Sequence, residues 1–205
     1  MITIETDRLT LRPFTLDDID ELAELHAEPT FWHYPLRRGH TLDETRAYLQ
    51  RTIERYDTDG VAMLAAVEKQ QGRMIGWLGL SVPHWLPEVL PAVEVGWRLG
   101  RRFWGHGFAT EGAAASINDG FERLGLAEIL SIYEPANVPS GAVMDRLGLV
   151  HRATTRAGER DLDLNIRALT YDKWQALRSN GDWPGHEMTK PDRLTPEVPG
   201  APTPA

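Results

Sequence analysis

The sequence contains no cysteine, which excludes disulfide bonds, thiolate nucleophiles and metal sites ligated by cysteine. No apolar run approaches the roughly 20 residues that a membrane-spanning helix needs. Residues 1–7 also lack the basic and apolar regions of a secretory signal. We therefore expect a cytoplasmic protein that is not bound to a membrane.

The chain also has fewer positively than negatively charged residues. Against 30 Asp and Glu the chain has only 22 Lys and Arg, a formal net charge of −8. General nucleic-acid binding depends on many cationic side chains that neutralise phosphates, so we expect no nucleic-acid partner. The acidic balance favours, weakly, a basic or amine-rich partner through electrostatic steering.

Length and composition indicate one domain. The 205 residues, 41% of them hydrophobic, suffice for a single sizeable core. We expect this domain over residues 1–178 and a tail over residues 179–205. The tail is rich in proline and poor in apolar residues, which is typical of a mobile segment. The alternative is that it packs on the domain as an arm.

Hydrophobic spacing predicts the element order βααβββαβαββα. Strands are expected over residues 9–12, 61–68, 74–82, 92–99, 128–133, 149–154 and 161–169, and helices over residues 15–28, 41–56, 109–124, 139–147 and 170–177. Such an order is typical of an α/β fold, with a mixed central sheet covered by helices.

A basic glycine loop lies between the strand at residues 92–99 and the helix that follows it. Gly105 and Gly107 allow backbone conformations that a Cβ would forbid, so their N–H groups can point at a ligand. The unpaired amides and positive dipole end of the next helix favour an anion such as phosphate. Arg101 and Arg102 add full positive charge. The segment therefore predicts an anion site, although glycines near an arginine also occur in ordinary turns.

Two motifs give this site a context. The pattern Arg102-x-x-Gly105-x-Gly107 resembles the acyl-CoA pyrophosphate loop of the GCN5-related N-acetyltransferase (GNAT) superfamily. The segment from Asn137 to Gly148 resembles the second signature of the branch that acetylates ribosomal-protein N-termini, the RimJ/RimL-like proteins. The resemblance extends in element order over residues 6–176. It implies the acyl-CoA N-acyltransferase fold, in which two parallel strands splay apart.

The resemblance also implies acetyl-CoA as co-substrate, with no metal. The residues expected to hold it come from the strand end, the glycine loop, the helix start and the second signature. They are Trp97, Arg98, Leu99, Arg101, Arg102, Phe103, Trp104, Gly105, His106, Gly107, Phe108, Ala109, Thr110, Asn137 and Ser140. Within the loop, His106 is expected to be a spacer that faces solvent. Asn137 is alternatively a helix cap, and both roles are compatible.

Two residues are candidates for the chemistry. Glu94 is a candidate general base, because a carboxylate in a partly dehydrated cleft has a raised pKa. The alternative is a structural ion pair with Arg98 on the same strand face. Many superfamily members use a tyrosine as acid at the position of Met144, which cannot donate a proton. In the ribosomal branch a serine at the position of Ser140 is the proposed acid; alternatively Ser140 satisfies backbone amides at a helix start.

The sequence thus predicts an N-acetyltransferase that moves an acetyl group directly to a primary amine in a ternary complex. The acceptor is left open among a protein N-terminus, a lysine and a small amine. The alternatives are a non-catalytic acyl-CoA-binding module and a transferase for another acyl-CoA, such as succinyl-CoA. Aromatic residues near Trp32 and Trp85 are expected to border the acceptor side, or else to pack internally or at a dimer contact. Monomer and homodimer are both compatible with the sequence.

Overall fold

The computed structural model describes residues 2–34, 36–157 and 162–185. Their strands form one mixed eight-stranded sheet in the order β1-β2-β3-β4-β5-β6-β8-β7. The strands are β1 (Ile4–Glu5), β2 (Leu9–Arg12), β3 (Leu64–Glu68), β4 (Arg73–Ser81), β5 (Glu94–Leu99), β6 (Glu128–Tyr133), β7 (Val150–Ala157) and β8 (Leu162–Thr170). The expected α/β class with a mixed sheet is confirmed.

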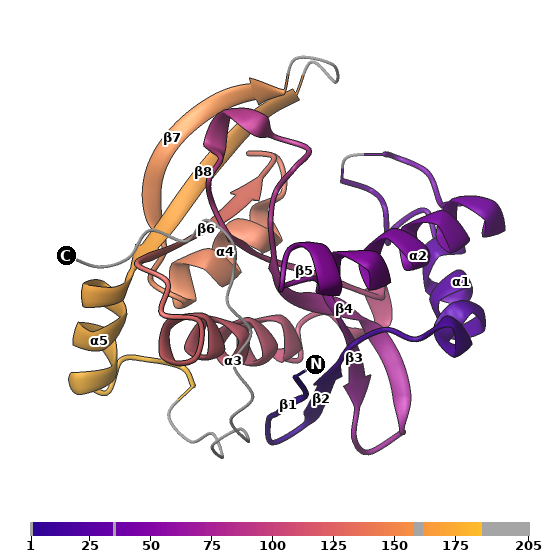
Figure 1. The fold of residues 1–205 in the computed structure, drawn as a ribbon, viewed down its shortest axis with the longest axis horizontal. Coiled ribbons are helices and arrows are strands. Elements are labelled where there is room, and N and C mark those ends of the chain that lie inside the picture. Colours follow the sequence, from indigo (N-terminus) through magenta and orange to yellow (C-terminus); the bar gives the residue numbers. More distant parts are fainter. Residues whose placement is uncertain (1, 35, 158–161, 186–205) are drawn as a thin grey trace.

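Helices cover both faces of the sheet. They are α1 (Ile19–Ala27), α2 (Leu42–Thr58), α3 (Phe108–Glu122), α4 (Val138–Arg146) and α5 (Tyr171–Ser179). Figure 1 shows α1 and α2 together on one side of β3 and β4, with α3 on the other. Single 3-10 turns precede α1, interrupt the connection from β4 to β5 and precede the glycine loop. The candidate site lies at the end of β5, in the middle of the sheet.

Element boundaries differ from the sequence prediction where pairing, not hydrophobicity, decides them. The strand expected from residue 61 begins at Leu64, because Val61 is buried in the core without joining the ladder. Strand β1 was not expected; it pairs with β2 over only two residues, too few to give a periodic pattern. Hydrophobic spacing indicates which residues are buried. It does not indicate which strands pair, because the hydrogen-bonded partners can lie far away in the sequence.

The parallel strands β5 and β6 separate almost as soon as they meet. They pair only at Glu94 and Leu130, with a hydrogen bond from Leu130 N to Val93 O of 2.9 Å. The Ser131 hydroxyl donates to Val95 O at 2.9 Å. Because successive residues of a strand direct their backbone groups to alternate edges, the backbone of Trp97 and Leu99 faces the gap beyond this point. The fold therefore leaves polar backbone available in the middle of the sheet.

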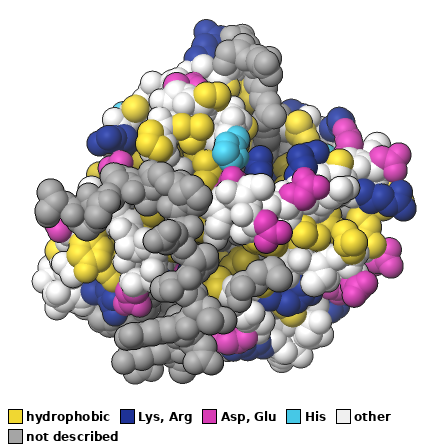
Figure 2. Space-filling view, viewed as in Figure 1, with side chains coloured by type: hydrophobic (Ala, Val, Ile, Leu, Met, Phe, Trp, Pro, Cys, Tyr) yellow, Lys and Arg dark blue, Asp and Glu magenta, His cyan; other side chains and the backbone are white. Residues whose placement is uncertain are grey.

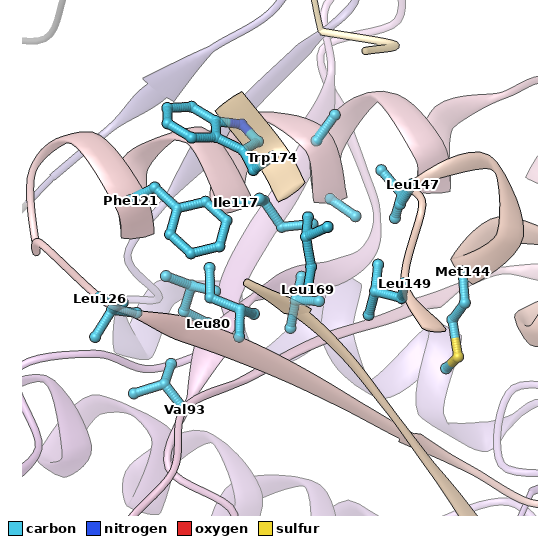
Figure 3. Packing of buried hydrophobic residues seen from close by; sticks show 14 of the residues in the cluster. Leu80, Val93, Ile117, Phe121, Leu126, Met144, Leu147, Leu149, Leu169 and Trp174 are labelled. Atoms are coloured by element: carbon cyan, nitrogen blue, oxygen red, sulfur yellow. The ribbon is translucent and has the colours of Figure 1, made fainter. Parts of the chain in front are cut away.

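The largest part of the core lies between the sheet and the layer of α3, α4 and α5. Figure 3 shows side chains from these helices and from β4, β6 and β8 converging there. Trp174 of α5 is anchored by a 2.9 Å hydrogen bond from its Nε1 to Asn118 Oδ1 of α3. Trp183 belongs to the same cluster, with only 2% of its surface exposed.

The buried Trp183 bears on the expected tail. The boundary placed at residue 178 falls one residue before the end of α5, and Trp183, which lies beyond it, packs in the core of the domain. The burial of one large aromatic side chain outweighs the polar and proline-rich composition around it. Residues 186–205 lie outside the described part of the chain.

Charges of both signs are interspersed on the face of the molecule that Figure 2 shows. Basic and acidic side chains alternate there instead of forming one basic surface. In the ranges that the structure describes, no helix combines the length and apolar character needed to span a bilayer. In the same ranges, no group of three or more His, Asp or Glu side chains is arranged to hold a metal ion.

Candidate active site

The glycine loop has the conformation that its composition suggests. Gly105 and Gly107 adopt φ values of 79° and 84°, in the left-handed region that other residues avoid. Gly107 is also the N-cap of α3, so the amides of the first helical turn begin directly after the loop. A Cβ on Gly107 would lie 3.3 Å from Arg8 Nη2. Backbone donors and a nearby cation therefore converge at one point, which suits an anion.

Arg8 is a residue of this site that the sequence reasoning missed. It lies between β1 and β2, and its Nη1 donates to His106 O at 2.8 Å while its Nε donates to Glu111 Oε2 at 2.7 Å. Its guanidinium also lies 4.6 Å from the centre of the Phe108 ring. Arg8 thus holds the loop against the start of α3. Nothing in the local sequence could have found it, because its partners are about 100 residues away.

A cavity of about 880 Å³ extends from this loop across the end of β5 to the start of α4. This volume is within the range of small-molecule and cofactor sites. Most of the expected cofactor residues line it: Trp97, Arg98, Leu99, Arg101, Phe103, Trp104, Gly105, Gly107, Phe108, Ala109, Thr110, Asn137 and Ser140. Residues that sequence reasoning did not select also line it: Asp7, Arg8, Phe31, Glu111, Pro139, Ala142, Val143, Arg146 and Pro184.

Three of the expected site residues do not line the cavity: Arg102, His106 and Glu94. Arg102 is exposed and lies over the Phe103 ring, with 4.8 Å between its guanidinium and the ring centre. His106 is also exposed, which agrees with its expected role as a spacer. Arg146, which the sequence reasoning did not select, adds a cation to the cavity wall. Its position inside the second signature could have indicated it.

The start of α4 brings Asn137 and Ser140 to the cavity wall. Asn137 is the N-cap, and its Oδ1 accepts a 3.3 Å hydrogen bond from the backbone N of Ser140. The capping alternative for Asn137 is therefore present together with its position in the wall. In the described residues, the Ser140 hydroxyl makes no hydrogen bond, so it does not act as a cap itself. Met144 is buried in the core.

Glu94 lies at the other end of β5, under the insert between β4 and β5. It is 8% exposed, and its Oε1 accepts from Trp85 Nε1 at 3.2 Å and from Ser81 Oγ at 3.4 Å. Burial raises the pKa of Glu94 to about 7, and the two hydrogen bonds oppose this rise in part. Because Glu94 does not line the cavity, any proton transfer to it requires a bridging group such as water.

The ion pair considered between Glu94 and Arg98 is wrong. Arg98 Nη1 donates instead to Phe31 O at 2.6 Å. Both residues are on the same strand face, but a rise of about 3.3 Å per residue separates their Cα atoms by about 13 Å. The two charges are held by different neighbours.

The two aromatic loops have separate roles. Trp32 packs inside, with its ring 3.9 Å from that of His40 and stacked on it. Tyr34 reaches the connection between β6 and α4, where its hydroxyl donates to Ala136 O at 2.9 Å. Trp85 covers Glu94 and remains 43% exposed. Within residues 30–34, Phe31 is the one that lines the cavity.

Together the fold and the cavity define an α/β protein whose glycine loop opens into a cavity beside the end of β5, where β6 has diverged. The sequence profile of the acetyltransferase (GNAT) domain matches residues 8–150, and the chain belongs to this family. It is an N-acetyltransferase of the GNAT family, and the family implies acetyl-CoA as co-substrate.

Individual proteins agree with this assignment. The chain is 30% identical over 162 residues to p20 of Bacillus licheniformis, described as an uncharacterized N-acetyltransferase, covering 78% of this chain and 89% of p20. An acetyltransferase from Agrobacterium tumefaciens superposes with a TM-score of 0.68 at 25% identity, covering 81% of this chain and 94% of its own. The ribosomal-protein-S5-alanine acetyltransferase of Vibrio fischeri superposes with a TM-score of 0.68 at 20% identity, covering 85% of this chain and 99% of its own. The last match shows the fold alone.

Proposed function

We propose that the protein transfers the acetyl group of acetyl-CoA directly to a primary amine while both substrates are bound. The observation that carries this proposal is the continuity of one cavity, from the glycine loop past the open end of β5 to Asn137 and Ser140. Such a path suits a ligand with phosphates at one end and a thioester at the other. The bound donor supplies the activated acyl group, and the chain supplies the groups that position it and move protons.

The donor end is proposed to bind phosphate mainly through backbone. The left-handed glycines of the loop lead directly into the first turn of α3, whose N–H groups have no partner within the helix. Arg101 lines the same part of the cavity and adds charge, whereas the charge of Arg8 is paired with Glu111 at 2.5 Å. The residues present therefore fit an acyl-CoA phosphate group.

In the middle of the cavity, the free backbone edge of β5 is proposed to stabilise the oxyanion. The N–H groups of Trp97 and Leu99 face the gap where β6 has diverged, and both residues line the cavity. Preorganised backbone donors are effective because they need no reorientation when negative charge develops.

Proton transfer is assigned to two side chains. Glu94 is proposed to take the ammonium proton through water, because a carboxyl with a pKa of about 7 is substantially deprotonated near neutral pH. Ser140 is proposed to protonate the leaving thiolate, since its hydroxyl is in the wall and has no competing bond in the described residues. A simple thiol has a pKa near 8.5, so this second step contributes modestly.

The test is thiol release from acetyl-CoA and from succinyl-CoA with a panel of peptides, amino acids, polyamines and aminoglycosides. Initial rates should give the intersecting pattern of a ternary complex, not the parallel lines that a covalent acyl-enzyme gives. Saturable acetyl-CoA binding without turnover on any amine would contradict the proposal. Faster turnover with succinyl-CoA would show that the donor is succinyl-CoA and not acetyl-CoA.

A further inference from the structure

Arg98 lies in the cavity wall but on the sheet face opposite to the donor loop. Along β5, Val95 and Leu99 pack toward α3, in the two clusters that contain residues of that helix. Gly96 and Arg98 face the side of α1 and α2; a Cβ on Gly96 would lie 2.6 Å from Met63 Cε on that side. Arg98 therefore projects toward the side from which an acceptor would approach the open strands.

The guanidinium of Arg98 is held in a fixed position. Its Nη1 donates to Phe31 O at 2.6 Å. It also lies over two indole rings, 4.3 Å from the centre of Trp32 and 5.4 Å from that of Trp77. Stacking and one strong hydrogen bond leave little freedom to the side chain. A cation held in this way is preorganised to bind an anion.

In the part of the chain that the structure describes, Arg98 forms no ion pair with a carboxylate. Among the same residues, its Nε is buried without a hydrogen-bond partner. Glu134 acts on it electrostatically; its Oε2 is bound to Arg37 at 2.6 Å, and its Oε1 is buried without a hydrogen-bond partner in the described residues. Burial lowers the pKa of Arg98 to about 10, so it is still charged at neutral pH. An enclosed charge without a counterion is unfavourable, and a ligand anion would relieve this.

The loop that contains Phe31, Tyr34 and Arg37 borders this end of the cavity, where Phe31 is part of the lining. It is tied to the connection between β6 and α4 by the Tyr34 hydroxyl on Ala136 O and by the ion pair of Arg37 with Glu134. The same loop supplies the Phe31 carbonyl that orients Arg98. Because these contacts cross to the connection between β6 and α4, the space beside Arg98 suits a small acceptor better than a folded protein surface.

Building on the proposed function, we propose that Arg98 binds a carboxylate of the acceptor. The acceptor is then a small molecule that carries a primary amine and a carboxylate, the combination found in amino acids. The planar fork of arginine matches a carboxylate with two parallel hydrogen bonds, which would also orient the amine relative to the thioester.

The experiment compares free amino acids with the corresponding amino acid amides as acceptors. For the wild-type protein, we expect kcat/KM to be at least about 10-fold higher for the acids, the effect of a charge-assisted bond. Arg98→Gln should abolish this preference by raising KM for the acids, while an amide donor to Phe31 O is retained. Arg98→Lys keeps the positive charge but loses the two parallel donors of the guanidinium, so it should retain part of the preference for acids over amides. Arg46→Gln, which removes an exposed charge on α2, is the matched control and should change nothing.

The outcomes separate this inference from the proposed function. Equal turnover of acids and amides, or a preference that survives in Arg98→Gln, would overturn the role of Arg98 and leave acetyl transfer standing. If no amine is acetylated, the proposed function fails. Calorimetry on the CoA-saturated protein then tests separately whether Arg98 binds a carboxylate. In that case N-acetyl amino acids should bind at least about 10-fold more tightly than their amides, and equal or absent binding would overturn the inference. Unchanged CoA affinity in both Arg98 variants shows that they fold.

Discussion

The proposed donor end of the cavity is lined mostly by one stretch, residues 101–110, with Arg8 from β1–β2, whereas the proposed acceptor end is lined by residues from separate segments. At the donor end, two left-handed glycines and a helix start present N–H groups in a fixed direction. At the acceptor end, Phe31, Arg98 and Ser140 come from a loop, a strand and a helix. Backbone recognition tolerates changes of side chain, while side-chain recognition changes with each substitution. Substitutions at the two ends should therefore have separable effects on donor binding and on turnover.

The largest expected effect is the loss of donor binding in Gly107→Glu. A side chain at φ 84° is strained, its Cβ would crowd Arg8, and a carboxylate would repel phosphate. We expect the affinity for acetyl-CoA, measured by calorimetry, to fall at least about 100-fold.

The matched control is Gly72→Glu. Gly72 also has a positive φ, of 62°, but a Cβ there would contact nothing within 4 Å. This variant should bear similar backbone strain and still bind acetyl-CoA normally. Undiminished affinity in Gly107→Glu would refute the assignment of the loop, and equal losses in both variants would attribute the effect to strain.

Glu94→Gln should lower turnover without affecting donor affinity. Loss of a general base reduces kcat by about 100-fold or more. In the wild type, kcat/KM should rise with pH through a midpoint near 7, because only the deprotonated carboxylate accepts the proton. The variant should lose this step. Glu88→Gln, at an exposed position of the same insert, is the control; an unchanged profile in Glu94→Gln would remove Glu94 from the mechanism.

The same raised pKa has a consequence for stability. The folded state holds the Glu94 proton up to about pH 7, whereas the unfolded state releases it near the ordinary value of 4.5. The contribution to the free energy of unfolding is thus complete below about pH 4.5 and is lost as the pH rises to about 7. Urea unfolding of wild type and Glu94→Gln at pH 5 and pH 8 should show this difference, and parallel pH dependences would contradict it.

A smaller effect is expected for Ser140→Ala. The helix-start bond uses the backbone N of Ser140, so the substitution leaves the Asn137 cap intact. We expect kcat to fall about 10-fold, because a thiolate can leave without full protonation, and acetyl-CoA affinity to change little. Steady-state kinetics and calorimetry test this. Unchanged kcat would exclude Ser140 as the acid.

The smallest effect is expected for Trp85→Phe. The indole N–H donates to Glu94 Oε1 and favours the charged carboxylate, so its loss should raise the pKa of Glu94. The midpoint of the pH-rate profile should move upward by less than about one unit, with the plateau rate retained. A downward shift, or none, would show that Trp85 does not influence Glu94.

Much of the fold followed from local patterns, and the errors have a common origin. The strand at Glu128–Tyr133 was predicted to the residue, and the capping pattern of Thr41 with Glu44 correctly gave the start of α2. By contrast, Val61 carries a strand-like pattern outside the sheet, and Trp183 is buried within a polar segment. In both cases the outcome depends on a contact with residues distant in the sequence.

The sequence by itself determined the family, the order of the elements from β2 onward and the left-handed glycines of the loop. These depend on residues close together along the chain, whose spacing fixes backbone conformation directly. Only the tertiary structure decided that Arg8 supports the loop, that Glu94 lies under Trp85 and that Arg98 has no carboxylate partner among the described residues. Those features come from segments separated by up to about 100 residues. Their proximity follows from packing of the whole sheet with its helices, which a linear pattern does not encode.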